Sequence, residues 1–334
     1  MNFSLIICTY QRPQALLKLL HSVQEQRLYP DQILIIDGST DQKTEKILQQ
    51  NQFKNLEYFQ VSKEDRGLTK QRNFGIKKVA TSSEIVCFLD DDIVLTPSYF
   101  KNLMSTYTAF PDAVGVGGYI IDDVEWRKLG SEEEGNSNEY SINGYARRDS
   151  SRFLLRKKLG LMPETFPTDM PPEGHGRSVG FLPPSGKTYQ VETFMGGVSS
   201  YKKDVFDHFN FSAFFQGYGL YEDTDFTLRL SKVGKLYLNT SAGLYHFHDE
   251  DGRPNQFKYG KMVVRNGWYV WRVKYPRPNT HSALRWHMIT GLLILIRLSN
   301  TVSTSNRKQA FTESIGRITG WLSLIFKKPK DKAV

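Results

Sequence analysis

The chain has 334 residues, of which 39% are hydrophobic and 24% are charged, so it is long and apolar enough to bury a sizeable core. The net charge of +9 is uneven, because residues from Gly252 onward hold 16 Lys or Arg against two acids, while the residues before Gly252 carry −5. No internal repeat or low-complexity tract is evident, which excludes the solenoid and disordered classes.

The N-terminus and the two cysteines indicate a cytoplasmic protein. Cys8 and Cys87 each lie within a short apolar run, as small core residues do, which fits a reducing compartment. The N-terminal sequence MNFSLIICTYQRP lacks a basic segment, and its apolar run is shorter than a signal peptide or a membrane span requires. We therefore expect this run to be a first strand.

Short apolar runs alternate with amphipathic stretches over the first 92 residues. The predicted strands are residues 3–8, 33–37, 56–61 and 84–89. The first helix between them places Leu16, Leu17, Leu20 and Val23 on one face. This alternation predicts an α/β fold with a mostly parallel, Rossmann-like sheet flanked by helices. Ligands of such folds bind at the carboxyl ends of the strands.

Asp37 ends the second predicted strand, at the edge where a parallel sheet binds its ligands. A turn or a helix cap would also explain an Asp followed by Gly and Ser. Further on, the sequence DRGLTKQRN places Arg66, Lys70 and Arg72 near the start of a helix, where they could face a phosphate. A solvated basic face is the alternative, so these three need not all bind a ligand.

Three acids directly follow the fourth predicted strand. In an extended chain, Asp90 and Asp92 point the same way and Asp91 points to the opposite side. Adjacent carboxylates repel one another, and Mg²⁺ or Mn²⁺ relieves that repulsion while neutralising a diphosphate leaving group. Capping of the next helix is the alternative, but Thr96 and Pro97 already supply an N-cap and a first helical residue. We therefore predict a metal site here.

The segment at about 125–190 breaks the alternating pattern. It combines an acidic cluster at 132–134, a basic stretch at 147–158 and proline-rich runs, which predicts an insertion of loops and short helices. After it, the sequence FMGGVSS contains Gly196 and Gly197. These glycines would let a ligand approach the backbone closely, although a tight turn explains them equally well.

A second acidic group lies in GYGLYEDTDFTLRL, where Glu222, Asp223 and Asp225 fall in the first turn of a predicted helix. The helix dipole stabilises acids there without any catalytic role. A transferase that acts on a hydroxyl, however, needs a carboxylate to accept its proton. Downstream, His246 and His248 would share one face of an extended stretch and could ligate Mn²⁺, or they could be ordinary core histidines.

The basic region at 251–334 is predicted to be helical. The run LRWHMITGLLILIRL is too short between charged or titratable residues to span a bilayer. A later helix has one apolar face and a basic end, which consist of Ile315, Ile318, Trp321, Leu322 and Ile325, and of Lys327, Lys328, Lys330 and Lys332. Such a helix could dock on an anionic membrane surface. Packing on the catalytic domain or in a dimer is the alternative.

Six motifs in order resemble the motif series of glycosyltransferase family 2: IICTYQRPQALLKLLHSV, ILIIDGSTD, GLTKQRNFGI, IVCFLDDDI, FMGGVSSYKKDVF and GYGLYEDTDFTLRLSKVG. The resemblance covers about residues 2–248. It implies a GT-A catalytic domain over 1–250, before the helical region at 251–334. The 125–190 insertion has no counterpart in the family, and we expect its loops to lie on the acceptor side. The resemblance also implies an inverting transfer from a nucleoside-diphosphate-sugar to a saccharide or lipid-linked acceptor, as in polysaccharide biosynthesis, with Mn²⁺ or Mg²⁺ as cofactor.

On that pattern Asp90 and Asp92 form the DxD metal motif, to which we add His246 and His248 as candidate ligands. Asp223 matches the usual catalytic base, with Glu222 as its substitute. The residues assigned to the donor site, including the two glycines, are Thr9, Tyr10, Arg12, Asp37, Arg72, Asp90, Asp91, Gly196 and Gly197. The chain departs from the family in having one acid in IIDGS and no C-terminal QxxRW motif, so we expect one sugar to be added per encounter.

Two other classes share part of these features. A dinucleotide-dependent dehydrogenase needs a G-x-G-x-x-G turn after the first strand, where this chain has CTYQRP. A basic nucleic-acid- or membrane-binding module that is not an enzyme would explain the isoelectric point of 9.3, and Trp268, Tyr269 and Trp271 in the basic region, but not the acidic clusters. We therefore expect a cytoplasmic enzyme at the inner face of the cell membrane, without a nucleic-acid partner.

Overall fold

The computed structural model describes residues 1–247 and 255–329 of the chain. It divides into two compact units, Met1–Glu125 with Pro184–Gly252, and Trp126–Pro183 with Arg253–Val334. Most of the segment that we expected as an insertion therefore shares a unit with the C-terminal helices.

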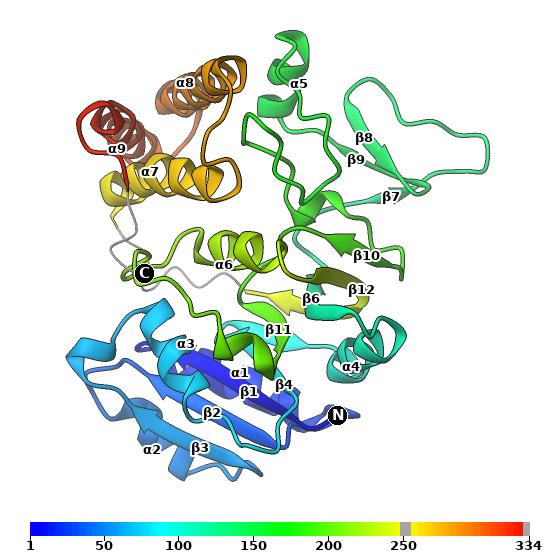
Figure 1. The fold of residues 1–334 in the computed structure, drawn as a ribbon, viewed down its shortest axis with the longest axis vertical. Coiled ribbons are helices and arrows are strands. Elements are labelled where there is room, and N and C mark those ends of the chain that lie inside the picture. The colour runs from blue at the N-terminus through cyan, green and yellow to red at the C-terminus, as the bar shows by residue number, and fades with distance from the viewer. Residues whose placement is uncertain (248–254, 330–334) are drawn as a thin grey trace. The chain divides into compact units, whose positions relative to one another are not determined.

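A nine-stranded sheet forms the centre of the first unit (Figure 1). Its strands are β1 (Phe3–Thr9), β2 (Gln32–Asp37), β3 (Leu56–Gln60), β4 (Ile85–Asp90), β5 (Ile93–Leu95), β6 (Ala113–Ile120), β10 (Thr188–Val191), β11 (Val198–Lys202) and β12 (Lys235–His246). Their order is β10-β12-β6-β11-β4-β1-β2-β3, with β5 paired to β12. The β3-β2-β1-β4 and β6-β12 pairs are parallel, whereas β5, β10 and β11 run antiparallel to their neighbours. The predicted α/β class and mostly parallel sheet are confirmed.

The helices of this unit are α1 (Pro13–Gln24), α2 (Lys43–Gln49), α3 (Leu68–Ile76), α4 (Tyr99–Ala109) and α6 (Glu222–Leu230), with short 3₁₀ turns η1 (Lys63–Asp65) and η3 (Lys203–Asp207). The apolar spacing of α1 buries Leu16, Leu19, Leu20 and Val23. The predicted start of α4 was wrong, since the helix begins at Tyr99. Thr96 is held elsewhere, because its hydroxyl donates to the carbonyl oxygen of Gly243 at 2.7 Å.

The register of the parallel strands brings their carboxyl ends to one edge of the sheet. Thr9 of β1 lies opposite Asp37 of β2, and Cys8 lies opposite Asp90 of β4. The strands that lead to this edge are buried and apolar, so packing on both faces fixes their register. Gln71 of α3 donates hydrogen bonds to the carbonyl oxygens of Thr9 and Ile36 at 3.1 and 2.8 Å. The amide thus ties α3 to the same edge.

The second unit contains a small antiparallel sheet and several helices. Its elements are β7 (Arg127–Lys128), β8 (Glu139–Ile142), β9 (Tyr145–Arg148), α5 (Ser151–Lys158), η2 (Val179–Phe181), α7 (Gln256–Lys274), α8 (Thr280–Ser303) and α9 (Arg307–Phe326). The expectation of loops and short helices at 125–190 missed the three strands, whose apolar alternation is too short to stand out. Asn143 and Gly144, both with positive φ, form the two-residue turn between β8 and β9. Asn-Gly is a strong hairpin signal that our sequence analysis overlooked.

Helices α7 and α9 pack against each other so closely that their backbones are in contact, and they lie side by side in Figure 1. A Cβ atom on Gly316 would lie 2.1 Å from the carbonyl oxygen of Phe257, and one on Gly260 would lie 2.1 Å from that of Glu313. The buried carboxylate of Glu313 accepts from Arg297 at 2.7 Å and from Arg317 at 2.6 Å. Because α7, α8 and α9 occupy most of the described residues from 255 onward, the predicted helical C-terminal region is confirmed. Over the described part of the chain, no helix combines the length and apolarity needed to cross a membrane.

Candidate functional site

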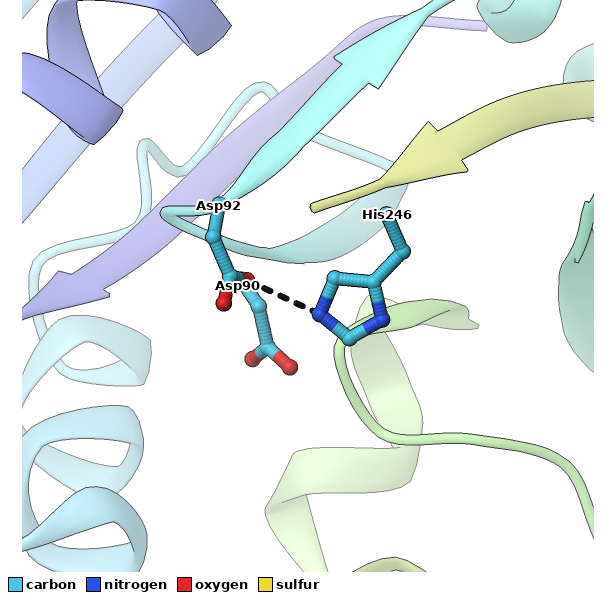
Figure 2. A group of neighbouring side chains, drawn as sticks. All are labelled: Asp90, Asp92 and His246. Carbon is cyan, nitrogen blue, oxygen red and sulfur yellow. Dashed lines mark hydrogen bonds and ion pairs between the residues drawn. The ribbon is translucent and has the colours of Figure 1, made fainter. Parts of the chain in front are cut away.

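Asp90, Asp92 and His246 meet at the carboxyl ends of β4 and β12, as Figure 2 shows. Asp90 ends β4, and Asp92 lies in the turn that leads to β5. Because β5 pairs with the end of β12, with Ile93 opposite His246, the histidine is brought next to Asp92. The distance from His246 Nε2 to Asp92 Oδ1 is 2.9 Å. One potential ligand atom from each of the three residues lies within 4.8 Å of the others, a spacing that fits a divalent cation.

The electrostatics of this group favour a cation. Burial raises the pKa of Asp90, and repulsion from Asp92 adds to that effect, while Arg72 opposes it. The Asp90 side chain keeps 39% of its surface exposed, so solvent moderates this shift and leaves the carboxylate accessible. Burial lowers the pKa of His246, but the hydrogen bond to Asp92 and the nearby carboxylate charges together outweigh burial, and the pKa is raised overall. A bound divalent cation would remove the carboxylate repulsion.

Asp91 points away from this group into the protein. Its Oδ2 accepts from the Thr9 hydroxyl at 2.7 Å, and its Oδ1 accepts from Arg12 Nη1 at 3.2 Å. Burial raises the pKa of Asp91 to about 7, against the opposing effects of Thr9 and Arg12. Arg12 also donates to Asp92 at 3.4 Å. Asp91 therefore positions Thr9 and Arg12, two of the residues assigned to the donor site, while Tyr10 between them in sequence is exposed.

A buried arginine joins Asp90 to the second acidic group. Arg72 of α3 is 2% exposed, forms an ion pair with Glu222 of α6, and lies 3.5 Å from Asp90. Its guanidinium carbon also lies 5.7 and 5.1 Å from the ring centres of Phe88 and Phe211. Burial raises the pKa of Glu222 to about 8, although Arg72 opposes the shift. The structure thus brings together residues that lie far apart along the chain.

Asp223 and Asp225 lie in different surroundings, although they are close in sequence. Asp223 Oδ2 accepts from the backbone N–H of Gly196 at 3.2 Å. Asp225 is fully buried and pairs with Arg229, one helical turn later, at 2.8 Å. Asp225 therefore stabilises α6 through an ion pair within the helix, whereas Asp223 faces Gly196 and the other residues of the site.

The two glycines before β11 let the backbone lie against these acids. A Cβ atom on Gly197 would lie 2.0 Å from Asp90 Oδ2, and one on Gly196 would lie 2.5 Å from Glu222 Oε1. No side chain fits at either position without displacing a carboxylate. The close approach that the glycines permit is thus to the protein's own acids.

The other predicted residues occupy varied positions. Asp37 is fully buried and accepts from the backbone N–H of Ser39 at 2.7 Å and from the Tyr58 hydroxyl at 3.0 Å. Lys70 is held apart from the acids, since its ammonium donates to the carbonyl oxygen of Glu64 at 2.5 Å. His248 lies outside the described residues. Gln71 and Tyr58 have no motif of their own and were not predicted. They contact the strand ends, Gln71 through the carbonyl oxygens of Thr9 and Ile36 and Tyr58 through Asp37.

Residues 4–162 match the family model described as Glycosyl transferase family 2. The chain is 27% identical over 132 residues to the Glucosyl-dolichyl phosphate glucuronosyltransferase of Haloferax volcanii, covering 38% of this chain and 41% of that protein. It is 29% identical over 105 residues to the O-antigen chain rhamnosyltransferase RfbN of Salmonella typhimurium, covering 31% of this chain and 32% of that protein. The matches thus span less than half the length of these relatives.

Among solved structures, the chain is similar to GalNAc-T7 crystallised with UDP, GalNAc and Mn²⁺. The TM-score is 0.51 at 15% sequence identity, and the match covers 90% of this chain and 57% of that one. This likeness shows that the fold is of the GT-A type.

Proposed function

We propose that this chain, whose residues 4–162 belong to glycosyl transferase family 2, transfers a sugar from a nucleoside-diphosphate-sugar to a hydroxyl of a glycan or lipid-linked acceptor, with inversion. The observation that carries the proposal is the grouping of Asp90, Asp92 and His246 beside Asp223 at the carboxyl edge of the sheet. The names of the two curated relatives, one acting on a dolichyl phosphate-linked sugar and one on an O-antigen chain, support this acceptor class.

Asp90, Asp92 and His246 would hold the divalent cation. Two carboxylates and an imidazole suit Mn²⁺ well, whereas Mg²⁺ prefers oxygen ligands. When bound, the cation neutralises the diphosphate leaving group as a Lewis acid. Arg72 contacts Asp90 at 3.5 Å and so orients that carboxylate, and Arg12 does the same for Asp92 at 3.4 Å.

Asp223 accepts the proton of the attacking hydroxyl. The backbone N–H of Gly196 fixes one of its carboxylate oxygens at 3.2 Å, and the N–H of Thr224 binds the other at 2.7 Å. Glu222 is less suited to this role, because its side chain is buried and ion-paired with Arg72. Glu222 instead holds Arg72 beside Asp90. A base placed in this way removes a proton as the acceptor oxygen attacks the donor.

Nucleotide binding tests the donor site directly. We expect one of UDP, GDP or dTDP to raise the thermal unfolding midpoint in Mn²⁺ and not in EDTA, since a ligand at about 100 times its Kd adds about 2.7 kcal/mol of stability. Gly197→Ala should lose this effect, because its Cβ would displace the Asp90 carboxylate. Gly130→Ala is the matched control, since the closest atom to its Cβ beyond the adjacent residues would be Glu133 Cβ at 3.7 Å.

The proposal fails if no nucleotide stabilises the chain, or if stabilisation is equal in Mn²⁺ and in EDTA. A chain that responds to no nucleotide but is retained on DNA in a salt-dependent manner would instead be a nucleic-acid-binding module. If nucleotide stabilises the Gly197→Ala variant as much as the unmodified chain, Asp90 is not part of the donor site.

We also place the protein in the cytoplasm, at the inner face of the cell membrane, through α8 and α9. Both helices expose apolar side chains, which are Leu284, Met288, Leu295 and Val302 on α8, and Phe311, Ile315, Leu322, Ile325 and Phe326 on α9. The glycines of α9 face α7, so this apolar face is not used in that crossing. Lys327 and Lys328 follow it and are exposed, while Lys330 and Lys332 lie outside the described residues. An apolar face beside basic residues fits an anionic bilayer surface.

Flotation with liposomes tests the membrane contact. The chain should float with anionic vesicles at low salt, and the double variant Leu322→Ser/Ile325→Ser should bind them at least several-fold less, because both side chains are more than half exposed on α9. Val233→Ser, which removes an equally exposed apolar side chain from the first unit, is the matched control. Absence of binding by the unmodified chain would refute the assignment. So would a double variant that binds normally, or one that only converts a dimer to a monomer.

A further inference from the structure

Three arginines surround one phenylalanine ring in the second unit. The guanidinium carbons of Arg152, Arg156 and Arg177 lie 5.1, 5.3 and 5.4 Å from the centre of the Phe153 ring. Arg152 and Arg156 stand one turn apart on α5, and Arg177 comes from the loop before η2. We call these three residues the arginine cluster. All three positive charges therefore lie within 5.4 Å of the centre of the Phe153 ring.

Two members of the cluster are buried with donors that no described residue satisfies. Arg156 is 2% exposed and donates from Nε to Leu161 and from Nη1 to His175, each at 2.9 Å to a carbonyl oxygen. Arg177 is 9% exposed and donates from Nη1 to the carbonyl oxygen of Pro163 at 3.1 Å. Arg156 Nη2 and Arg177 Nε are buried and have no hydrogen-bond acceptor within the described chain. Buried donors without acceptors are unusual in folded proteins.

The acids near the cluster attract its arginines without a close contact, since Glu173 acts on Arg156 and Asp149 acts on Arg177. Asp149 is buried near Arg177, yet it forms no ion pair within 4 Å across the described residues, and burial raises its pKa. Glu173 is already paired with Arg285 at 3.5 Å. Burial and the neighbouring Arg177 lower the pKa of Arg156 to about 10, so the guanidinium stays charged at neutral pH. Buried charges are normally paired at close range, and within residues 1–247 and 255–329 neither Arg156 nor Arg177 has an ion pair shorter than 4 Å.

We propose that the arginine cluster binds a phosphoryl group, and that this group belongs to a lipid diphosphate. The lipid assignment rests on the proposed function, whereas the binding of the anion does not. Guanidinium groups match the geometry and charge of phosphate oxygens, and the unused N–H groups of Arg156 and Arg177 supply the buried donors. Arg152 is exposed and lies 5.1 Å from the centre of the same Phe153 ring.

Calorimetric titration of the full chain tests the anion site, with inorganic pyrophosphate as probe and EDTA present so that the metal site does not contribute. We expect the double variant Arg152→Gln/Arg177→Gln to bind at least tenfold more weakly than the unmodified chain. Arg156→Lys keeps the charge but loses Nη2, and should also bind several-fold more weakly. The double variant Arg148→Gln/Lys158→Gln removes two exposed cations from the same segment, and should bind normally.

Three results would overturn the anion site: no binding of pyrophosphate at millimolar concentration, an equal loss in the control variant, or normal binding by both cluster variants with an unchanged unfolding midpoint. Farnesyl diphosphate tests the lipid-linked source, because it should bind at least as tightly as pyrophosphate, and its exclusion would overturn that assignment. These titrations contain neither donor nor metal, so their failure is distinguishable from a failure of donor turnover.

Discussion

The Asp92→Ala variant is expected to lose sugar transfer by at least about 100-fold, because it removes one ligand of the divalent cation and releases another. Asp92 Oδ1 lies 2.9 Å from His246 Nε2, so the histidine loses the partner that orients it. Asp90→Ala should have a comparable effect, since Asp90 supplies the second carboxylate of the group. The measurement is the rate of nucleoside-diphosphate release as a function of Mn²⁺ concentration. Higher Mn²⁺ should restore little of the lost rate.

Asp122→Ala is the matched control, because Asp122 is an exposed acid of the same unit. It should leave the rate and its metal dependence unchanged. Full activity of either Asp90→Ala or Asp92→Ala, or of the unmodified chain in excess chelator, would exclude the metal role of these residues.

The Asp223→Asn variant is expected to keep donor binding and to lose transfer by on the order of 10²- to 10⁴-fold, the usual effect of removing a general base. An amide oxygen can still accept from the backbone N–H of Gly196, so the local structure should persist. It cannot take the proton of the acceptor hydroxyl. Donor affinity and transfer rate are measured on the same preparation, which separates the loss of the base from the loss of the site.

Glu222→Gln distinguishes the two adjacent acids. Because Glu222 is ion-paired with Arg72, its substitution should weaken donor binding through Arg72 and Asp90 as well as lowering the rate. If Asp223→Asn stays within a few-fold of the unmodified enzyme while Glu222→Gln retains donor binding and loses transfer, the base is Glu222.

The parallel strands β1 to β4 could be predicted from sequence because they are short apolar runs separated by helices. The antiparallel strands β10 and β11 could not, since pairing with distant strands decides their direction. The same holds for β7, β8 and β9, which are two to four residues long. Local patterns carry no information on such long-range pairing.

In the candidate site, too, local features could be predicted from sequence and long-range contacts could not. The run from Asp90 to Asp92 is visible in sequence because the acids are adjacent at a strand end. The contact between Asp92 and His246 depends on the pairing of β5 with β12, and the ion pair between Arg72 and Glu222 joins residues 150 positions apart. The role of Gly197 was open in sequence, because only the fold shows that its backbone lies against Asp90.

Release of nucleoside diphosphate from a panel of UDP-, GDP- and dTDP-sugars, in Mn²⁺ and in EDTA, tests the central claim most directly. We expect at least one donor to be turned over in Mn²⁺ and none in EDTA, because the diphosphate cannot leave until its charge is neutralised at Asp90, Asp92 and His246. Turnover that is equal in Mn²⁺ and in EDTA would contradict the account.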